Sequence, residues 1–292
     1  MEHMKKIVKI TSWTFLILLL PVVGYSIYVY QSSPWVKALA NHDESQLFYR
    51  PTTKVYDIDD VVYYESILVV EDSLTVYAYI FEPVIPPKAK IFLIHGNSGN
   101  VSTNAEAIKA LVNNGFMVYS VDWRGYGKST GVPSYQGILA DTEEAFTDFY
   151  EGSPIDSLKT IVYGMSLGGQ LAVKIAKDNP SKIDALVLDG SLASAHSFIE
   201  DNVEGSVLSL LMKKPEDYNQ DYVAVRDIVD IENMPKLIIH SKTDRAVPFK
   251  RGQSIYDAAQ EPKEFWETDT EHIRTLQDLT KETIEKLEAL IQ

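Results

Sequence analysis

Residues 164–169 read Gly-Met-Ser-Leu-Gly-Gly, and they place a serine between two glycines. The apolar run Thr160–Tyr163 precedes them, and a helical pattern rich in Leu and Ala follows. A tight turn from a strand into a helix holds its central residue in a strained conformation, and glycines on either side let neighbouring backbone pass closely. The pattern therefore predicts a nucleophile elbow that presents the hydroxyl of Ser166 at a helix N-terminus.

A serine hydroxyl is a weak nucleophile at neutral pH, so hydrolysis needs a base in hydrogen-bond reach, an acid that orients this base, and donors for the oxyanion. The best candidate base is His272, which follows the last predicted strand (264–266) in a loop before the final helix. Each of the other histidines lies near the N-terminus, in a predicted lid, or at a strand end where a structural role is commoner: His3, His42, His95, His196 and His240.

Two aspartates follow predicted strands and compete for the role of the acid. Asp244 lies after the penultimate strand and before His272, which produces the chain order Ser, Asp, His that this kind of site uses. Asp189 precedes Gly190 and is more typical of a loop or cap residue. We predict Asp244 as the acid and keep Asp189 as the alternative.

The loop His95–Gly99 follows the strand that ends at Ile94, and it has glycines on both sides of Asn97. These glycines allow the loop to turn inward, so the backbone N–H groups of Asn97 and Leu167 are the predicted oxyanion hole. An ordinary Gly-rich turn is the alternative, and a phosphate-binding loop would need a Gly-Lys-Ser/Thr sequence that is missing. In residues 122–129, Asp122 and Arg124 are expected to hold adjacent loops through charge-assisted hydrogen bonds.

Two β-rich runs, 61–70 and 74–81, predict an antiparallel hairpin at the start of the domain. Short apolar runs then alternate with helical patterns, which predicts a parallel sheet with helices on both faces. The expected later strands are 90–94, 116–121, 160–163, 185–188, 237–239 and 264–266, and the expected helices are 104–112, 137–150, 167–178, 250–259 and 275–291.

The connection between the strands near Leu188 and Leu237 is too long for an ordinary loop, so residues 191–230 are predicted to form a small lid. Its apolar residues are spaced for an amphipathic helix that could hold an acyl chain or, equally well, seal the lid to the core: Phe198, Ile199, Val203, Val207, Leu208, Leu210, Leu211 and Met212. The same segment has eight acidic and three basic residues, which favours neutral over strongly anionic substrates.

Lys5, Lys6 and Lys9 precede the uncharged stretch 10–30, which has about the length needed to cross a bilayer as a helix. The expected domains are therefore a basic segment 1–9, a transmembrane anchor 10–30, a tether 31–52 and an α/β domain 53–292. Basic residues before the anchor favour a single-pass protein with an extracytoplasmic catalytic domain. The alternatives are a signal peptide cleaved after residues 38–40 and a buried core helix.

The composition suits one large α/β domain plus an appendage, because the chain has 292 residues and 45% hydrophobic content. The net charge of −14, with no block of Lys or Arg after the first nine residues, argues against nucleic-acid partners. The chain has no cysteine, which excludes a thiol nucleophile, a disulfide framework and a thiolate metal site. Neither a metal nor a cofactor is expected.

The ordered motifs at 95–97, 122–127 and 164–168, followed by Asp244 and His272, resemble the α/β-hydrolase superfamily over about residues 55–290. Within it the chain is similar to the serine aminopeptidase-like group and to small membrane-associated esterases and depalmitoylases. The resemblance implies an α/β-hydrolase fold and a Ser-His-Asp hydrolase with a lid and no cofactor. A hydrophobic helix here replaces the N-terminal Cys cluster used for lipidation, so a depalmitoylase role is only an analogy.

The predicted function is a membrane-anchored serine hydrolase that cleaves carboxylic esters, or thioesters or small amides, through an acyl-enzyme. The alternative from another class is a non-catalytic, membrane-tethered binding protein on the same scaffold. A dehalogenase is disfavoured because that chemistry needs Asp where Ser166 stands.

Overall fold

The computed structural model describes residues 20–70, 73–152 and 158–292, and the chain divides between Phe48 and Tyr49 into two compact units. In the first unit, residues 20–32 are helical and are followed by α2 (Pro34–Asn41) and α3 (Glu44–Phe48). Half of the predicted anchor, 10–19, lies outside the described residues. Among those that are described, we find no helix with both the length and the apolar character needed to cross a membrane.

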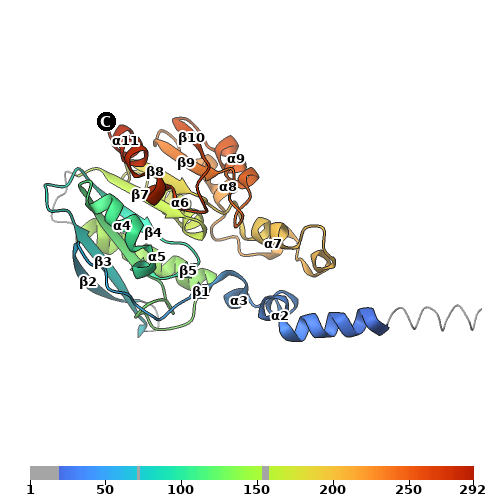
Figure 1. Ribbon diagram of the computed structural model, residues 1–292. Helices are drawn as coiled ribbons and strands as arrows, with labels where there is room; N and C mark the ends of the chain where they lie inside the picture. Colours follow the sequence, from blue (N-terminus) through green and yellow to red (C-terminus); the bar gives the residue numbers. More distant parts are fainter. Residues whose placement is uncertain (1–19, 71–72, 153–157) are drawn as a thin grey trace, which may run out of the picture. The chain divides into compact units, whose positions relative to one another are not determined.

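The second unit is built on an eight-stranded sheet (Figure 1). In spatial order the strands are β10 (Lys263–Thr268), β9 (Lys236–Ser241), β8 (Ala185–Asp189), β7 (Thr160–Met165), β4 (Ala89–Ile94), β6 (Phe116–Asp122), β3 (Thr75–Glu82) and β2 (Val62–Val69). Strand β3 pairs antiparallel with both β2 and β6, and all other pairs are parallel. A separate two-residue parallel bridge joins β1 (Arg50–Pro51) to β5 (Ser98–Gly99).

Helices cover both faces of this sheet. On one face, α4 (Ala105–Val112) contacts α10 (Thr275–Asp278), which precedes α11 (Thr280–Leu290). On the other face, α5 (Tyr135–Glu151), α6 (Leu167–Asp178), α8 (Ala224–Asp227) and α9 (Phe249–Ala258) contact one another in that order. The remaining elements are α7 (Ala195–Val203) and the 3-10 turns η2 (Val101–Asn104), η3 (Val207–Leu211), η4 (Pro215–Asp217) and η5 (Ile228–Asp230).

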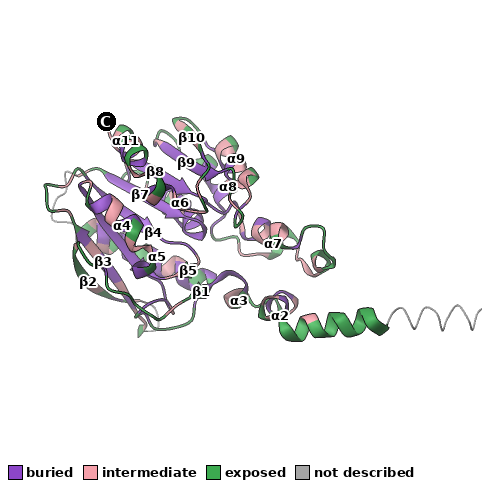
Figure 2. Ribbon diagram, in the orientation of Figure 1, coloured by how far each residue is buried: buried purple, intermediate pink, exposed green. Residues whose placement is uncertain are grey.

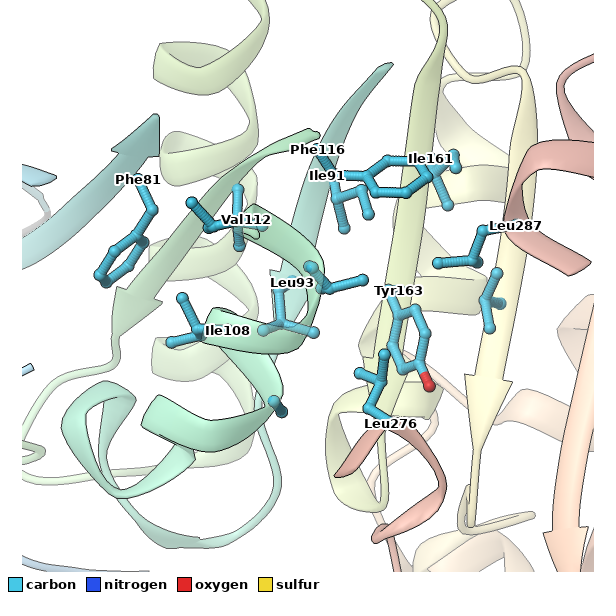
Figure 3. Packing of buried hydrophobic residues seen from close by; sticks show 14 of the residues in the cluster. Phe81, Ile91, Leu93, Ile108, Val112, Phe116, Ile161, Tyr163, Leu276 and Leu287 are labelled. Atoms are coloured by element: carbon cyan, nitrogen blue, oxygen red, sulfur yellow. The ribbon is translucent and has the colours of Figure 1, made fainter. Parts of the chain in front are cut away.

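The five central strands are buried along their whole length, which is the pattern of a parallel sheet covered on both faces (Figure 2). Figure 3 shows one side of this core, where Ile91 and Leu93 of β4 and Tyr163 of β7 meet Ile108 of α4 and Leu287 of α11. Burial of this apolar surface fixes the strand order, and the order in turn determines which strand ends lie next to one another.

The structure confirms the predicted sheet and its antiparallel start, although residues 71–72 of the predicted hairpin turn lie outside the described residues. Two helical predictions differ from the structure. The expected final helix is broken at Leu279, whose backbone (φ −127°, ψ 45°) leaves the helical region between α10 and α11.

The single amphipathic helix predicted for the lid is wrong. Helix α7 ends at Val203, Gly205 then takes φ +73°, and the Ser206 side chain accepts a hydrogen bond from the Leu208 amide to start the 3-10 turn η3. Two of the apolar residues assigned to that helix are instead open to solvent, since Val207 is 74% and Leu210 is 82% exposed.

Candidate active site

Ser166 lies in the turn between β7 and α6, with φ +53° and ψ −119°. A non-glycine residue pays for such a conformation, at about 1–3 kcal/mol, so the surroundings must impose it. The Ser166 amide donates to the Asp189 carbonyl at 2.9 Å, and the Ser166 carbonyl accepts from the Gly169 amide at 3.0 Å. Backbone bonds on both sides thus hold the elbow in place.

The glycines around Ser166 are required by close packing. A Cβ atom at position 168 would lie 2.3 Å from the carbonyl oxygen of His95, and one at position 164 would lie 2.6 Å from Cβ of Ala172. Both distances are far below van der Waals contact, so α6 approaches the sheet this closely only with glycine at these positions.

Polar residues lie at or just after the carboxyl ends of four neighbouring parallel strands. Ser166 follows β7, Asp189 ends β8, Asp244 follows β9, and His272 follows β10. The structure brings three of them into contact: His272 Nε2 lies 3.0 Å from Ser166 Oγ, and His272 Nδ1 lies 2.6 Å from Asp244 Oδ2. The imidazole therefore bridges a hydroxyl and a carboxylate.

Asp244 is held rigidly, with its side chain 1% exposed. Its Oδ1 accepts hydrogen bonds from the amides of Ala246 (2.8 Å) and Val247 (2.9 Å). Burial opposes ionisation of Asp244, but the His272 hydrogen bond and charge, together with the two amides, outweigh it and lower the pKa of this carboxyl. Asp244 is therefore an anion at neutral pH, and its charge faces the imidazole.

Asp189 has a different environment, because it still belongs to β8 and points into the layers of the fold. The Tyr163 hydroxyl donates to its Oδ2 at 3.1 Å, and no hydrogen bond joins it to His272 within the described residues. Burial raises the pKa of Asp189 to about 7, although the Tyr163 hydrogen bond and the His272 charge act in the opposite direction. Asp189, the alternative acid, is therefore hydrogen-bonded to Tyr163, whereas Asp244 is the aspartate bonded to the imidazole of His272.

His95 and His240 are both buried at strand ends. His95 Nδ1 lies 2.7 Å from the Gly96 carbonyl oxygen, and burial lowers the pKa of His95 to about 4. His240 Nε2 lies 2.9 Å from the carbonyl oxygen of Val247, and burial lowers its pKa as well. Both rings are therefore neutral structural groups, and His240 supports the loop that carries Asp244.

The predicted oxyanion donors, Asn97 and Leu167, lie on the two segments that flank Ser166. Leu167 is the first residue of α6, so its amide is one that the helix leaves without an intrahelical acceptor. The Asn97 carbonyl accepts from the Arg50 amide at 2.8 Å and from the Tyr126 hydroxyl at 2.7 Å. A Cβ atom at Gly96 would lie 3.2 Å from Ser166 Cβ, so this loop passes directly over the serine.

A pocket of about 320 Å³ opens above these groups. It is lined by Ser166 and His272, the 96–98 loop, Asn104, Leu192, Phe198 and Asn202 of α7, residues 245–247, and Ile273. Of the eight apolar residues assigned to the lid helix, only Phe198 is among these lining residues. Within the described part of the chain, no group of three or more His, Asp or Glu side chains is arranged to hold a metal ion.

Arg124 does not line the pocket, and it ties its loop to helix α5, which agrees with the predicted structural role. Its guanidinium forms a bidentate ion pair with Asp141 of α5, with Nη2–Oδ1 at 2.7 Å and both side chains buried. Asp122 accepts a hydrogen bond from the Val101 amide at 2.6 Å, so it also joins two loops. Sequence reasoning missed Asp141 and the Tyr126 contact with Asn97, because no local pattern marks a partner on a distant helix or loop.

Comparisons with known proteins agree with this architecture. Residues 85–218 match the family described as serine aminopeptidase, S33, a range that includes Ser166 and ends before Asp244 and His272. The uncharacterised protein YfhR of Escherichia coli K12 is 28% identical over 237 residues, which cover 79% of this chain and 81% of that protein.

Two solved structures share the fold. The Pyrococcus furiosus esterase Pf2001 is 19% identical with a TM-score of 0.66, and the match covers 83% of this chain and 98% of that one. An alpha-beta hydrolase from Vibrio vulnificus is 18% identical with a TM-score of 0.69 and covers 88% of this chain and 94% of its own. Together with the sheet order and the strand-to-helix elbow, these matches show that the chain has the α/β-hydrolase fold, and they support its assignment to the α/β-hydrolase superfamily.

Proposed function

We propose that the protein is a serine hydrolase that cleaves carboxylic esters through an acyl-enzyme. The observation that carries the proposal is the continuous hydrogen-bonded chain from Ser166 through His272 to Asp244, at 3.0 and 2.6 Å, below an open pocket. Thioesters and small amides would follow the same chemistry, and we place esters first because the Pyrococcus furiosus protein that shares this fold is an esterase.

In the first half of the reaction, His272 Nε2 removes the proton from Ser166 Oγ as this oxygen attacks the ester carbonyl carbon. Asp244 stabilises the imidazolium that forms and keeps Nδ1 protonated. The amides of Leu167 and Asn97 are the proposed donors to the oxyanion, and His272 then returns the proton to the departing alcohol. In the second half, water attacks the acyl group by the same route and regenerates the serine.

The test compares the wild type with Ser166→Ala on short 4-nitrophenyl esters and with a fluorophosphonate probe, which reacts quickly only with an activated serine. Ser254→Ala, a serine of α9 outside the pocket, is the matched control. We expect Ser166→Ala to lose turnover and labelling while Ser254→Ala keeps both. Full activity of Ser166→Ala would refute the assignment, and folded wild-type protein that neither turns over nor labels would favour a binding role.

We also propose that residues 10–30 anchor the protein in a membrane, with the catalytic domain on the outer side. The uncharged stretch and the lysines before it support this proposal. We expect the full-length protein to stay in the membrane pellet after carbonate extraction, and a protease added outside intact cells to digest the hydrolase domain. A mature protein that begins near Asn41 would instead show that the segment is a cleaved signal.

A further inference from the structure

The pocket above Ser166 carries a positive charge within a strongly acidic protein. Among its described lining residues, Arg245 is the only Lys or Arg, and there is no Asp or Glu. The chain as a whole has a net charge of −14. The overall composition would predict acidic residues around the pocket, and Arg245 is instead a cation that lines it.

Arg245 also differs from the other arginines in having no partner among the described residues. Four of the six arginines form ion pairs with carboxylates, at positions 124, 226, 251 and 274, and Arg50 donates to the Tyr49 carbonyl. The Arg245 side chain is exposed and has neither an ion pair nor a hydrogen bond to any described residue. The neighbouring Asp244 carboxylate does not neutralise it, because its oxygens are taken by His272 and by the amides of Ala246 and Val247.

The acidic residues of the lid do not offset this charge. In α7, Asp201 and Glu200 pair with Arg251, with shortest N–O distances of 2.7 and 2.6 Å. Glu204 pairs with Lys250 at 3.3 Å. None of these three acids lines the pocket. The excess of acidic residues in the lid favoured a neutral substrate in the sequence analysis. None of those acidic residues is among the described residues that line the pocket.

We propose that Arg245 is a specificity residue that binds a carboxylate carried by the substrate, so that the preferred esters are monoanionic. This inference rests on the proposed function, since it names the class of ester cleaved at Ser166. A guanidinium binds a planar carboxylate through two parallel N–H···O bonds, which fixes the substrate as well as attracting it. A single cation neutralises one negative charge, which suits a monoanionic ester. A dianionic phosphate ester would keep one uncompensated negative charge, and the chain's net charge of −14 would repel it.

The experiment uses two matched pairs of esters. In the first pair the charge is in the acyl group: mono-4-nitrophenyl glutarate against 4-nitrophenyl valerate. In the second it is in the alcohol part: 4-acetoxybenzoate against 4-methylphenyl acetate. The ratio of kcat/KM for the anionic to the neutral ester is measured for the wild type, Arg245→Gln, Arg245→Lys and the control Lys281→Gln, whose exposed side chain lies on α11 outside the pocket.

We expect Arg245→Gln to lower the anionic-to-neutral ratio about tenfold in at least one pair, the size of a charge-assisted hydrogen bond. The affected pair tells whether the carboxylate lies on the acyl or the alcohol side. Arg245→Lys should keep part of the preference, Lys281→Gln should keep all of it, and added salt should reduce it in the wild type. A change below about twofold in both pairs for Arg245→Gln would overturn the proposal.

A binding measurement separates this proposal from the proposed function. Calorimetric titration of Ser166→Ala, with and without Arg245→Gln, needs no turnover, and it uses monomethyl glutarate for the acyl side and 4-acetoxybenzoate for the alcohol side. We expect the dissociation constant of at least one of these ligands to rise at least about fivefold when the guanidinium is removed. Equal affinity of the two variants for both ligands would refute the role of Arg245, whether or not the wild type hydrolyses esters.

Discussion

The replacement Asp244→Asn tests the charge behind the imidazole while it preserves the size of the side chain. Asp244 Oδ2 lies 2.6 Å from His272 Nδ1, and the carboxylate is buried. At an effective dielectric constant of about 20, two unit charges at about 3–4 Å attract each other by about 4–5 kcal/mol. This attraction exists only when the imidazolium forms, so its loss raises the barrier and should lower kcat by about 10³- to 10⁴-fold.

The assay is the steady-state hydrolysis of a neutral 4-nitrophenyl ester by folded protein, compared with Asp189→Asn as the matched control. Asp189 is also a buried aspartate at a neighbouring strand end, but its hydrogen bonds go to Tyr163 and Thr275. We expect Asp189→Asn to lower kcat less than about tenfold, because it leaves the carboxylate on His272 in place. A loss of 10³-fold in Asp189→Asn, with Asp244→Asn within tenfold of wild type, would refute the assignment of the acid.

Three further predictions concern stability. The folded pKa of Asp189 is raised to about 7, so its contribution to stability is greatest below its unfolded pKa and declines as the pH rises towards 7. Between pH 5 and pH 8, the free energy of unfolding measured in urea should therefore fall by about 2–3 kcal/mol more in the wild type than in Asp189→Asn. An equal fall in the two proteins would contradict this prediction. Gly168→Ala places a methyl group 2.3 Å from the His95 carbonyl oxygen and should cost about 3 kcal/mol or more in unfolding free energy, so a cost below about 1 kcal/mol would be inconsistent with the packing of the elbow. Asp141→Asn breaks the buried ion pair with Arg124 and should lower the free energy of unfolding by about 3–5 kcal/mol. The kcat/KM of the folded fraction should change little, because neither residue lines the pocket. A large loss of activity in fully folded protein would argue for a direct role.

The amino-acid sequence determined the features that depend on neighbours along the chain. Alternating apolar and helical patterns predict the parallel sheet, because each strand must be buried on both faces. The glycines around Ser166 predict the elbow, since only backbone without a Cβ atom allows that approach. The break in the lid was also encoded locally, in Glu204-Gly205-Ser206, although the apolar spacing on either side of it predicted a continuous helix.

Only the tertiary structure decided which groups meet across the sheet. Asp189 and Asp244 both follow the expected pattern of a strand end, and nothing in their local sequence shows that one carboxylate lies within the strand layers while the other reaches His272 from a loop. That Arg245 has no partner among the described residues is likewise invisible in the sequence, because it depends on where the carboxylates of distant segments are directed. Such contacts join residues many positions apart, and they exist only because burial of the core sets the order of the strands.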